Sequence, residues 1–317
     1  MALHIIMYHY VRDFAASPYS GIKGLDIREF QDQLDHLSAR FEILSPQCAK
    51  DRIAAKSTFQ DDCCWLTFDD GYKDHITHVA PALEQRGLRA SFFAPVRTTR
   101  HAEVLDVNKI HFILSEGPGA AGLLAEVRAL YLEFGTDTGT GGVDGFGPHL
   151  KAIDSRSRFD DATTIQVKRL LQAELPLALR QKICDRLFEK YVSADQVGFA
   201  QELYMGAADI STLHAAGHEI GAHGVNHYWF SRLTRAGQEA EITGSLDYLR
   251  GLAVLGADWS MCFPYGDHDD TTLELLQKHG CAIGLTVRPE PVRGDRYSGL
   301  ALPRFDTNDF PGARTRR

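Results

Sequence analysis

Short apolar runs alternate with stretches that carry apolar residues at helical spacing in the N-terminal third of the chain. The runs within residues 64–68 and 90–94 are typical of buried strands. Between them, residues 74–86 place apolar side chains three and four positions apart, which is the spacing of one helix face. A strand, a helix and a second strand in this order predict a parallel β-sheet with helices packed on it.

The same alternation continues on both sides of this segment. We expect further strands over residues 3–10, 41–44, 219–222, 259–263, 281–287 and 300–305, and helices over residues 26–37, 207–216, 235–251 and 271–279. Residues 101–205 contain mainly helical patterns instead. We therefore predict one α/β domain over residues 1–317, a distorted and incomplete barrel of parallel strands alternating with helices, in which residues 101–205 are a mainly helical insertion.

Composition excludes several classes of protein. The chain has 34 basic and 42 acidic residues and a net charge of −8, which disfavours general affinity for nucleic acid. No stretch reaches the roughly 18 uninterrupted apolar residues that indicate a transmembrane helix. The N-terminus lacks the basic and apolar regions of an export signal, and the six cysteines show no C-x-x-C spacing. We therefore expect free thiols in a reducing, cytoplasmic environment.

Two adjacent carboxylates, Asp69 and Asp70, follow the predicted strand at residues 64–68. Successive side chains of a regular strand point to opposite faces, so both carboxylates reach one pocket only if the backbone bends. Gly71 permits a bend at this point. Two close carboxylates suit a division of labour between a metal ligand and a general base, although Asp-Gly is also an ordinary turn sequence.

A pair of histidines follows the predicted strand at residues 219–222. His223 and His227 are four residues apart, a spacing that places two side chains on one face of a helical turn. Two imidazoles and one carboxylate form a three-ligand zinc site with an open position for water, as in catalytic zinc centres. The spacing alone would favour a surface loop with two unrelated histidines. Because the aspartate pair lies upstream, a metal site is the preferred interpretation.

Together these motifs resemble those of polysaccharide deacetylases, the NodB-homology or carbohydrate esterase family 4 enzymes. Residues 67–71 (Thr-Phe-Asp-Asp-Gly) and 223–227 (His-Gly-Val-Asn-His) resemble the first two motifs of the family. Residues 263–266 (Phe-Pro-Tyr-Gly) resemble part of the third. The resemblance covers about residues 1–100 and 206–310, and it implies a TIM-barrel-like catalytic domain of the NodB type.

The resemblance also implies a role for each motif. Asp70, His223 and His227 would bind a divalent metal, which we expect to be Zn2+. Asp69 would be the general base that takes a proton from the attacking water. The backbone N–H of Tyr265, which follows the proline of the third motif, would stabilise the oxyanion. A general acid is also required, because an amine leaves only with a proton.

Two positions depart from the family pattern. Cys262 stands where the third motif usually begins with an arginine that helps to hold the base. We expect Arg304 either to replace this arginine from another strand or to form a surface ion pair. Residues 302–304 (Leu-Pro-Arg) lack the histidine of the family's late Leu-x-His motif, which would supply the acid. We therefore expect His9, at the end of the first strand, to donate the proton, with Asp306 as the alternative.

These features predict a metal-dependent hydrolase that removes an acetyl group from an N-acetylated sugar. The missing export signal favours a substrate made inside the cell, such as a precursor or unit of a surface polysaccharide, for example the O-antigen of lipopolysaccharide. Two alternatives stay open: an amide hydrolase of the same fold that acts on a non-sugar, cyclic amide, and a non-catalytic sugar-binding protein with a vestigial site. Metal content separates the binding protein from both enzymes, and a substrate screen separates the enzymes.

Overall fold

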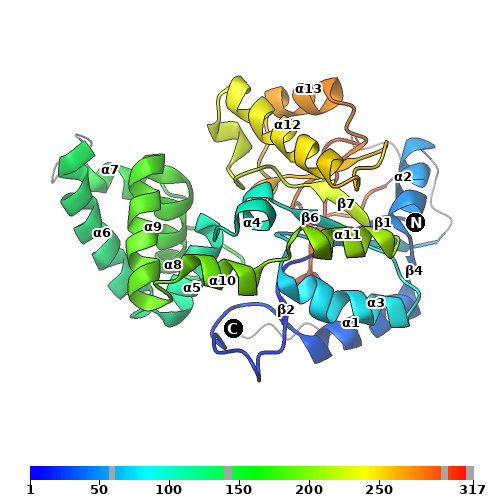
Figure 1. Ribbon diagram of the computed structural model, residues 1–317, viewed down its shortest axis with the longest axis horizontal. Coiled ribbons are helices and arrows are strands. Elements are labelled where there is room, and N and C mark those ends of the chain that lie inside the picture. Colours follow the sequence, from blue (N-terminus) through cyan, green and yellow to red (C-terminus); the bar gives the residue numbers. More distant parts are fainter. Residues whose placement is uncertain (57–60, 139–144, 294–298, 312–317) are drawn as a thin grey trace. The chain divides into compact units, whose positions relative to one another are not determined.

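A computed structural model describes residues 1–56, 61–138, 145–293 and 299–311 (Figure 1). The chain forms two compact units. The first, which we call the barrel unit, contains Met1–Asp13, Lys23–Glu103 and Ala200–Arg317. The second, the helical unit, contains Phe14–Ile22 and Val104–Phe199. All of the predicted site residues belong to the barrel unit.

The barrel unit is built on a parallel sheet with the strand order β10-β1-β5-β6-β7-β8-β9, and β4 pairs with the first residues of β5. Leu302 bridges to Leu285 in β9, and the residues just after it form β10, which pairs with β1. One short segment therefore links the two edges of the sheet, and the predicted barrel of parallel strands is confirmed. The strands are β1 (Leu3–Tyr8), β4 (Glu42–Ile43), β5 (Cys63–Phe68), β6 (Ser91–Ala94), β7 (Glu219–Ala222), β8 (Ser260–Cys262), β9 (Ile283–Leu285) and β10 (Phe305–Asp306).

Helices cover the outer face of this sheet, and α12 and α13 pack side by side (Figure 1). Capping residues explain where several of them begin. Asp26 and Glu29 form a capping box at the start of α1, and Thr234 accepts a hydrogen bond from the backbone of the first turn of α12. The helices of this unit are α1 (Ile27–Arg40), α2 (Pro46–Ala54), α3 (Ala80–Gln85), α4 (Val96–His101), α11 (Ala207–Ala215), α12 (Arg235–Gly251) and α13 (Asp270–Lys278).

Alternate residues of the strands face two different layers of apolar side chains. In β5, Leu66 and Phe68 belong to the layer that contains the buried residues of α1 and α12. Cys63 and Trp65 belong to the layer inside the barrel, together with buried residues of β1, β6, β8 and β9. Because the side chains of a strand alternate, the inward face of β5 continues through Thr67 toward the carboxyl end of the strand.

The predicted helix over residues 74–86 is interrupted. It begins as a π-helix, His75–Val79, and becomes the α-helix α3 only at Ala80. Pro81 gives a physical reason, because it lacks the N–H that would bond to the carbonyl of Thr77 in an α-helix. The wider π turn lies next to the candidate site, where such turns are frequent.

The helical unit agrees with the mainly helical character that the sequence indicates for residues 101–205. It also contains Phe14–Ile22, which the sequence analysis did not assign to it. The ring of Tyr19 packs edge-on against Phe112 and Phe199, with centroids 5.0 and 5.5 Å away. In the described ranges of the chain, no helix has the length and apolar character needed to span a bilayer. The helices are α5 (Asp106–Glu116), α6 (Gly119–Thr138), α7 (Phe146–Lys151), α8 (Ala162–Arg169), a π-helix (Leu170–Glu174), α9 (Leu177–Tyr191) and α10 (Gln196–Leu203), whose last residues belong to the barrel unit.

Candidate metal and catalytic site

Asp69 and Asp70 follow β5 at the carboxyl end of the barrel strands. Asp69 continues the inward face of the strand. Asp70 has a φ of 71°, and this left-handed conformation turns the chain so that the second carboxylate is not carried to the opposite face. Gly71 also has a positive φ of 68°, and a Cβ at this position would lie 2.6 Å from the Cβ of Ala94. The bend that the sequence predicts at Gly71 therefore begins one residue earlier, at Asp70.

His223 and His227 lie on an irregular loop that follows β7. The helical turn suggested by their spacing is wrong. Gly224 and His227 have positive φ values of 71° and 59°, and these two left-handed residues fold the loop back on itself. The two imidazole rings are brought together with their centroids 4.9 Å apart.

Glu241, on α12, holds this loop in place. One of its carboxylate oxygens accepts hydrogen bonds from the backbone N–H groups of Val225 and Asn226 at 2.7 and 2.8 Å. The other accepts a hydrogen bond from the side-chain amide of Asn226 at 2.5 Å. Glu241 is buried, so these donors compensate for the loss of water around its charge. Sequence reasoning missed this residue, because a single glutamate in an amphipathic helix gives no signal of such a contact.

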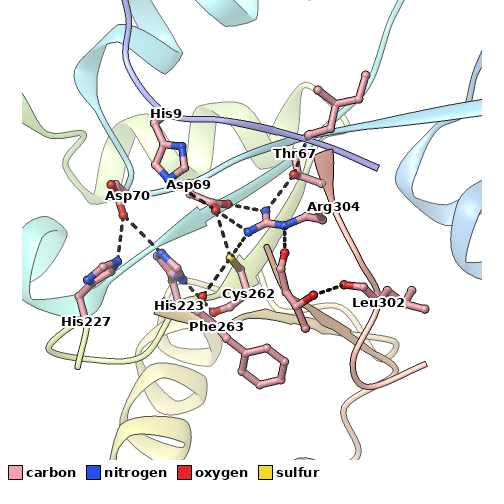
Figure 2. Close-up of polar contacts among 12 residues, drawn as sticks. His9, Thr67, Asp69, Asp70, His223, His227, Cys262, Phe263, Leu302 and Arg304 are labelled. Atoms are coloured by element: carbon pink, nitrogen blue, oxygen red, sulfur yellow. Dashed lines mark hydrogen bonds and ion pairs between the residues drawn. The ribbon is translucent and has the colours of Figure 1, made fainter. Parts of the chain in front are cut away.

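Asp70, His223 and His227 form a compact, buried cluster. Figure 2 shows both imidazoles directed at the same carboxylate oxygen: Oδ1 of Asp70 lies 3.3 Å from Nε2 of His223 and 3.2 Å from Nε2 of His227. Metal–ligand bonds of about 2.0–2.1 Å in tetrahedral geometry place ligand atoms about 3.3 Å apart. Both carboxylate–imidazole distances therefore match the spacing around a divalent metal such as Zn2+, and all three ligand atoms lie within 4.8 Å of one another.

The ionised carboxylate of Asp70 and the orientation of the His223 ring suit metal binding. Burial alone raises the pKa of Asp70, but hydrogen bonds from His223 and His227 outweigh it and hold the pKa well below its usual range. Nδ1 of His223 lies 2.8 Å from the carbonyl oxygen of Cys262. Because a carbonyl only accepts hydrogen bonds, Nδ1 carries a proton. Burial lowers the pKa of His223, but the neighbouring Cys262 and Asp70 outweigh it and raise the pKa, so without a metal Nε2 also carries a proton, directed at Asp70. A bound metal would take the place of this second proton.

Arg304 pairs with Asp69 inside the barrel (Figure 2). Its Nη1 and Nη2 donate to the two carboxylate oxygens at 3.0 and 2.7 Å. The remaining N–H groups donate to Thr67 Oγ1, Thr286 O and Cys262 Sγ, so all five guanidinium donors are used. Arg304 is 0% exposed, and the surface ion pair that we considered for it is therefore wrong.

Cys262 explains how Arg304, which lies just before β10, reaches Asp69. Its thiol accepts a hydrogen bond from Arg304 Nη2 at 2.9 Å and donates one to Asp69 Oδ2 at 3.2 Å. Burial raises the pKa of this thiol, so the thiol stays protonated and can donate the hydrogen bond to Asp69. A side chain as small as cysteine leaves space beside Asp69, and the guanidinium of Arg304 fills it.

Replacing Arg304 with methionine is expected to shift the acid limb of the pH profile upward. Burial raises the pKa of Asp69, but the Arg304 charge overcomes this and lowers the pKa to about 2. Without the guanidinium, burial becomes the dominant influence and raises the pKa of Asp69, so the carboxylate takes up a proton at higher pH. We expect the acid limb of kcat/KM to move up by about 1–3 pH units. Arg304→Lys, which keeps the charge, should move the limb less.

Lys50→Met provides a matched control for this variant. Lys50 also forms a buried ion pair, with Glu219 at 2.8 Å, but Glu219 begins β7 and so lies at the opposite end of the strands. Breaking either pair is expected to cost about 3–5 kcal/mol of stability. Only the Arg304 variant should change the pH profile. Equal profiles for the two variants would show that Arg304 acts on stability alone.

Tyr265 lies beside the histidine pair in a short 3-10 turn, Pro264–Gly266. Its φ of 59° belongs to a region that bulky residues rarely adopt, and such strain is concentrated at functional sites. The Tyr265 ring packs edge-on against His227, with centroids 4.8 Å apart, and stacks on Trp229 at 4.7 Å. These contacts fix Tyr265 next to the loop that carries His223 and His227. Trp229 was not identified from the sequence.

His9 directly follows β1, and its Nε2 lies 4.0 Å from Oδ2 of Asp69 (Figure 2). Its side chain is 39% exposed, so it borders both the buried carboxylate and solvent. Asp306, the alternative acid, instead caps the turn Thr307–Asp309 by accepting a hydrogen bond from the N–H of Asn308 at 2.9 Å. The geometry favours His9 of these two candidates.

Comparisons with known proteins agree with this site. A sequence model of the family described as polysaccharide deacetylase matches residues 56–108 and 181–284, which contain the aspartate pair, both histidines and Tyr265. A search of the curated proteins found no match.

Solved structures with the same fold include three bacterial proteins. The first is the deacetylase PplD of Streptococcus pyogenes in complex with acetate (TM-score 0.58, 14% identity, 96% of this chain and 92% of that chain). The second is IcaB from Ammonifex degensii (TM-score 0.55, 18% identity, 96% and 91%). The third is the BpsB deacetylase domain from Bordetella bronchiseptica (TM-score 0.54, 15% identity, 96% and 95%). At these identities the likeness concerns the fold.

The sequence match therefore decides the family. It covers residues 67–71 and 223–227, which contain the candidate base and metal ligands. The three solved structures have the same fold as this chain. The chain belongs to the polysaccharide deacetylase family, the NodB-homology enzymes that remove acetyl groups from carbohydrates with the help of a metal.

Proposed function

We propose that this protein removes the acetyl group from an N-acetylated sugar, with Asp70, His223 and His227 as the ligands of its metal. The observation that carries the proposal is the buried cluster of these three side chains beside an ionised Asp69. Two imidazoles and one carboxylate favour Zn2+ among the common divalent metals. A bound metal would polarise the acetyl carbonyl and make the attacking water more acidic.

The residues around this cluster divide the remaining work. Asp69 takes the proton of the attacking water, and the fork of Arg304 fixes the orientation of its carboxylate. The backbone N–H of Tyr265 donates to the oxyanion of the tetrahedral intermediate. The amine then leaves with a proton from the imidazolium form of His9, whose Nε2 lies 4.0 Å from Oδ2 of Asp69.

Acetate release from N-acetylated saccharides tests this function. The parent protein, loaded with Zn2+, should release acetate from at least one acetylated sugar and lose this activity when a chelator removes the metal. The same screen should contain cyclic amides. In this chain Arg304 takes the place of the arginine that the family usually has at position 262, and this difference keeps a same-fold amide hydrolase as the alternative. Metal binding without hydrolysis of any substrate class would point to a sugar-binding protein with a vestigial site.

The substrate that we propose is a cell-surface polysaccharide or a precursor of one, for example an O-antigen unit. The substrate class of the family supports a saccharide. We further propose a precursor as the substrate and the cytoplasm as the place of reaction. The screen should therefore compare sugar nucleotides, lipid-linked saccharides and oligosaccharides. Cell fractionation tests the location, and faster hydrolysis of a mature polymer than of any precursor would overturn this choice.

Replacing His9 with glutamine is expected to reduce kcat by about a hundredfold and to remove the alkaline limb of the pH profile. Glutamine keeps a polar side chain of similar length but does not release a proton, and general acid catalysis contributes about 10²–10⁴. We expect the lower end of this range, because His9 is 39% exposed and water can replace it in part. Zn2+ affinity should not change.

His101→Gln is the matched control for this variant, because His101 is an exposed histidine at the end of α4. It should retain the kcat and the pH profile of the parent. If the alkaline limb persists in His9→Gln, His9 has a structural role and another group donates the proton.

A further inference from the structure

The two carboxylate oxygens of Asp70 have different surroundings. Oδ1 faces the imidazoles of His223 and His227 at 3.3 and 3.2 Å. Oδ2 accepts a hydrogen bond from the phenol O–H of Tyr72 at 2.6 Å. This bond is buried, and its length is typical of a hydroxyl that donates to a charged oxygen. One oxygen is therefore directed at the metal-ligand cluster and the other is bound to the protein.

Tyr72 is held in the position that this hydrogen bond requires. Its ring is fully buried and stacks on Tyr10 with centroids 4.0 Å apart and an angle of 22° between the planes. Tyr204, which directly follows α10, forms an isolated β-bridge with Tyr72. The two rings also stack, with centroids 6.0 Å apart. Met205 N–H also donates to Gly71 O at 2.9 Å. The phenol is thus fixed by ring packing and by backbone contacts of Gly71 and Tyr72.

We propose that Tyr72 is a positioning residue that makes Asp70 a one-oxygen metal ligand. The inference rests on the proposed metal site and adds a residue that the motifs do not name. A phenol bound to Oδ2 fixes the plane of the carboxylate and keeps this oxygen from joining Oδ1 on the metal. The coordination positions that a two-oxygen carboxylate would occupy then stay available for water and the substrate carbonyl.

Tyr72→Phe tests the proposal, because phenylalanine keeps the stacked ring and removes only the hydroxyl. We expect the dissociation constant for Zn2+ alone to rise about 10–100-fold. We also expect the visible absorption of bound Co2+ to change, because it reports the number and arrangement of the ligands. A loss of stability alone would leave the Co2+ spectrum of the folded protein as it is in the parent.

Tyr8→Phe is the matched control. Tyr8 is also fully buried in the barrel unit, and its hydroxyl forms no hydrogen bond within the part of the chain that the structure describes. This variant should bind Zn2+ and Co2+ as the parent does. If Tyr72→Phe gives the same Zn2+ affinity and the same Co2+ spectrum as Tyr8→Phe, the proposal is overturned.

Two further variants separate this inference from the metal site itself. If His227→Ala binds Zn2+ as tightly as the parent, the proposed site is wrong, and the role of Tyr72 is wrong with it. If His227→Ala loses the metal but Tyr72→Phe does not, only the role of Tyr72 is overturned. In an Asp70→Ala background, Tyr72→Phe should cause no additional loss of affinity, because the phenol acts through that carboxylate. An equal additional loss would mean that Tyr72 acts in another way.

Discussion

Replacing Asp69 with asparagine is expected to remove most of the turnover and to leave the metal bound. Asparagine has nearly the same shape, but its amide does not take a proton from water at working pH. The loss of a general base reduces kcat by about 10²–10⁴. Asp69 is not among the three side chains of the proposed metal site, so Zn2+ stoichiometry should stay at that of the parent. Steady-state kinetics and metal analysis of one preparation measure both quantities.

The asparagine also changes the contacts with Arg304, and this effect needs a control. Its single oxygen keeps one of the two hydrogen bonds that Asp69 accepts from the guanidinium. Asp74→Asn makes the same change in another buried carboxylate, which accepts a hydrogen bond from Arg12 at 3.1 Å. We expect Asp74→Asn to retain nearly all of the parent turnover. Near-parent turnover of Asp69→Asn would exclude Asp69 as the base.

Replacing either His223 or His227 with alanine is expected to abolish tight metal binding and, with it, activity. Each change removes one of three ligands in a cluster whose ligand atoms all lie within 4.8 Å of one another. Removing a hydrogen-bond partner of a metal ligand typically lowers metal affinity about 10–100-fold. Removing a ligand itself should lower the affinity by more than this. Competition with a chelator of known affinity measures the dissociation constant for Zn2+.

His218→Ala controls for the loss of a buried imidazole. His218 precedes β7, is buried, and its Nδ1 accepts a hydrogen bond from the N–H of Ala90 at 3.2 Å. This variant should lose stability and keep Zn2+. If His223→Ala and His227→Ala bind Zn2+ as tightly as His218→Ala does, the metal lies elsewhere.

The sequence predicts most of the barrel, because each strand and each helix carries its own periodicity and the caps mark where helices begin. Its failures come from backbone conformations that leave no trace in apolar patterns. The spacing of His223 and His227 suggested a helical turn, but the left-handed conformations at Gly224 and His227 make this segment an irregular loop. The π turn before α3 is similar, since the pattern of apolar residues there is that of an ordinary helix.

Residues that act through others were the hardest to find from the sequence. The motifs indicate Asp69 and Asp70 directly, but the partners of these carboxylates come from positions without a motif. Glu241 accepts hydrogen bonds from the loop that carries His223 and His227, and Tyr72 donates one to Asp70. These contacts form only in the folded chain. Arg304 is an intermediate case, because Cys262 indicated that an arginine was missing and Arg304 was named as its replacement, but the sequence left a surface ion pair as the alternative.

The long separation between Asp69 and Arg304 has a consequence for how the chain matures on the ribosome. The two residues are 235 positions apart, so the carboxylate is synthesised long before its partner emerges. An arginine at position 262, as in the family motif, would be available 42 residues earlier than Arg304. Until the last strand is added, Asp69 lacks the cation that offsets its burial, and the nascent barrel has an incomplete catalytic pocket. The pocket around Asp69 is therefore complete only when the segment just before and within β10 has joined β9 and β1.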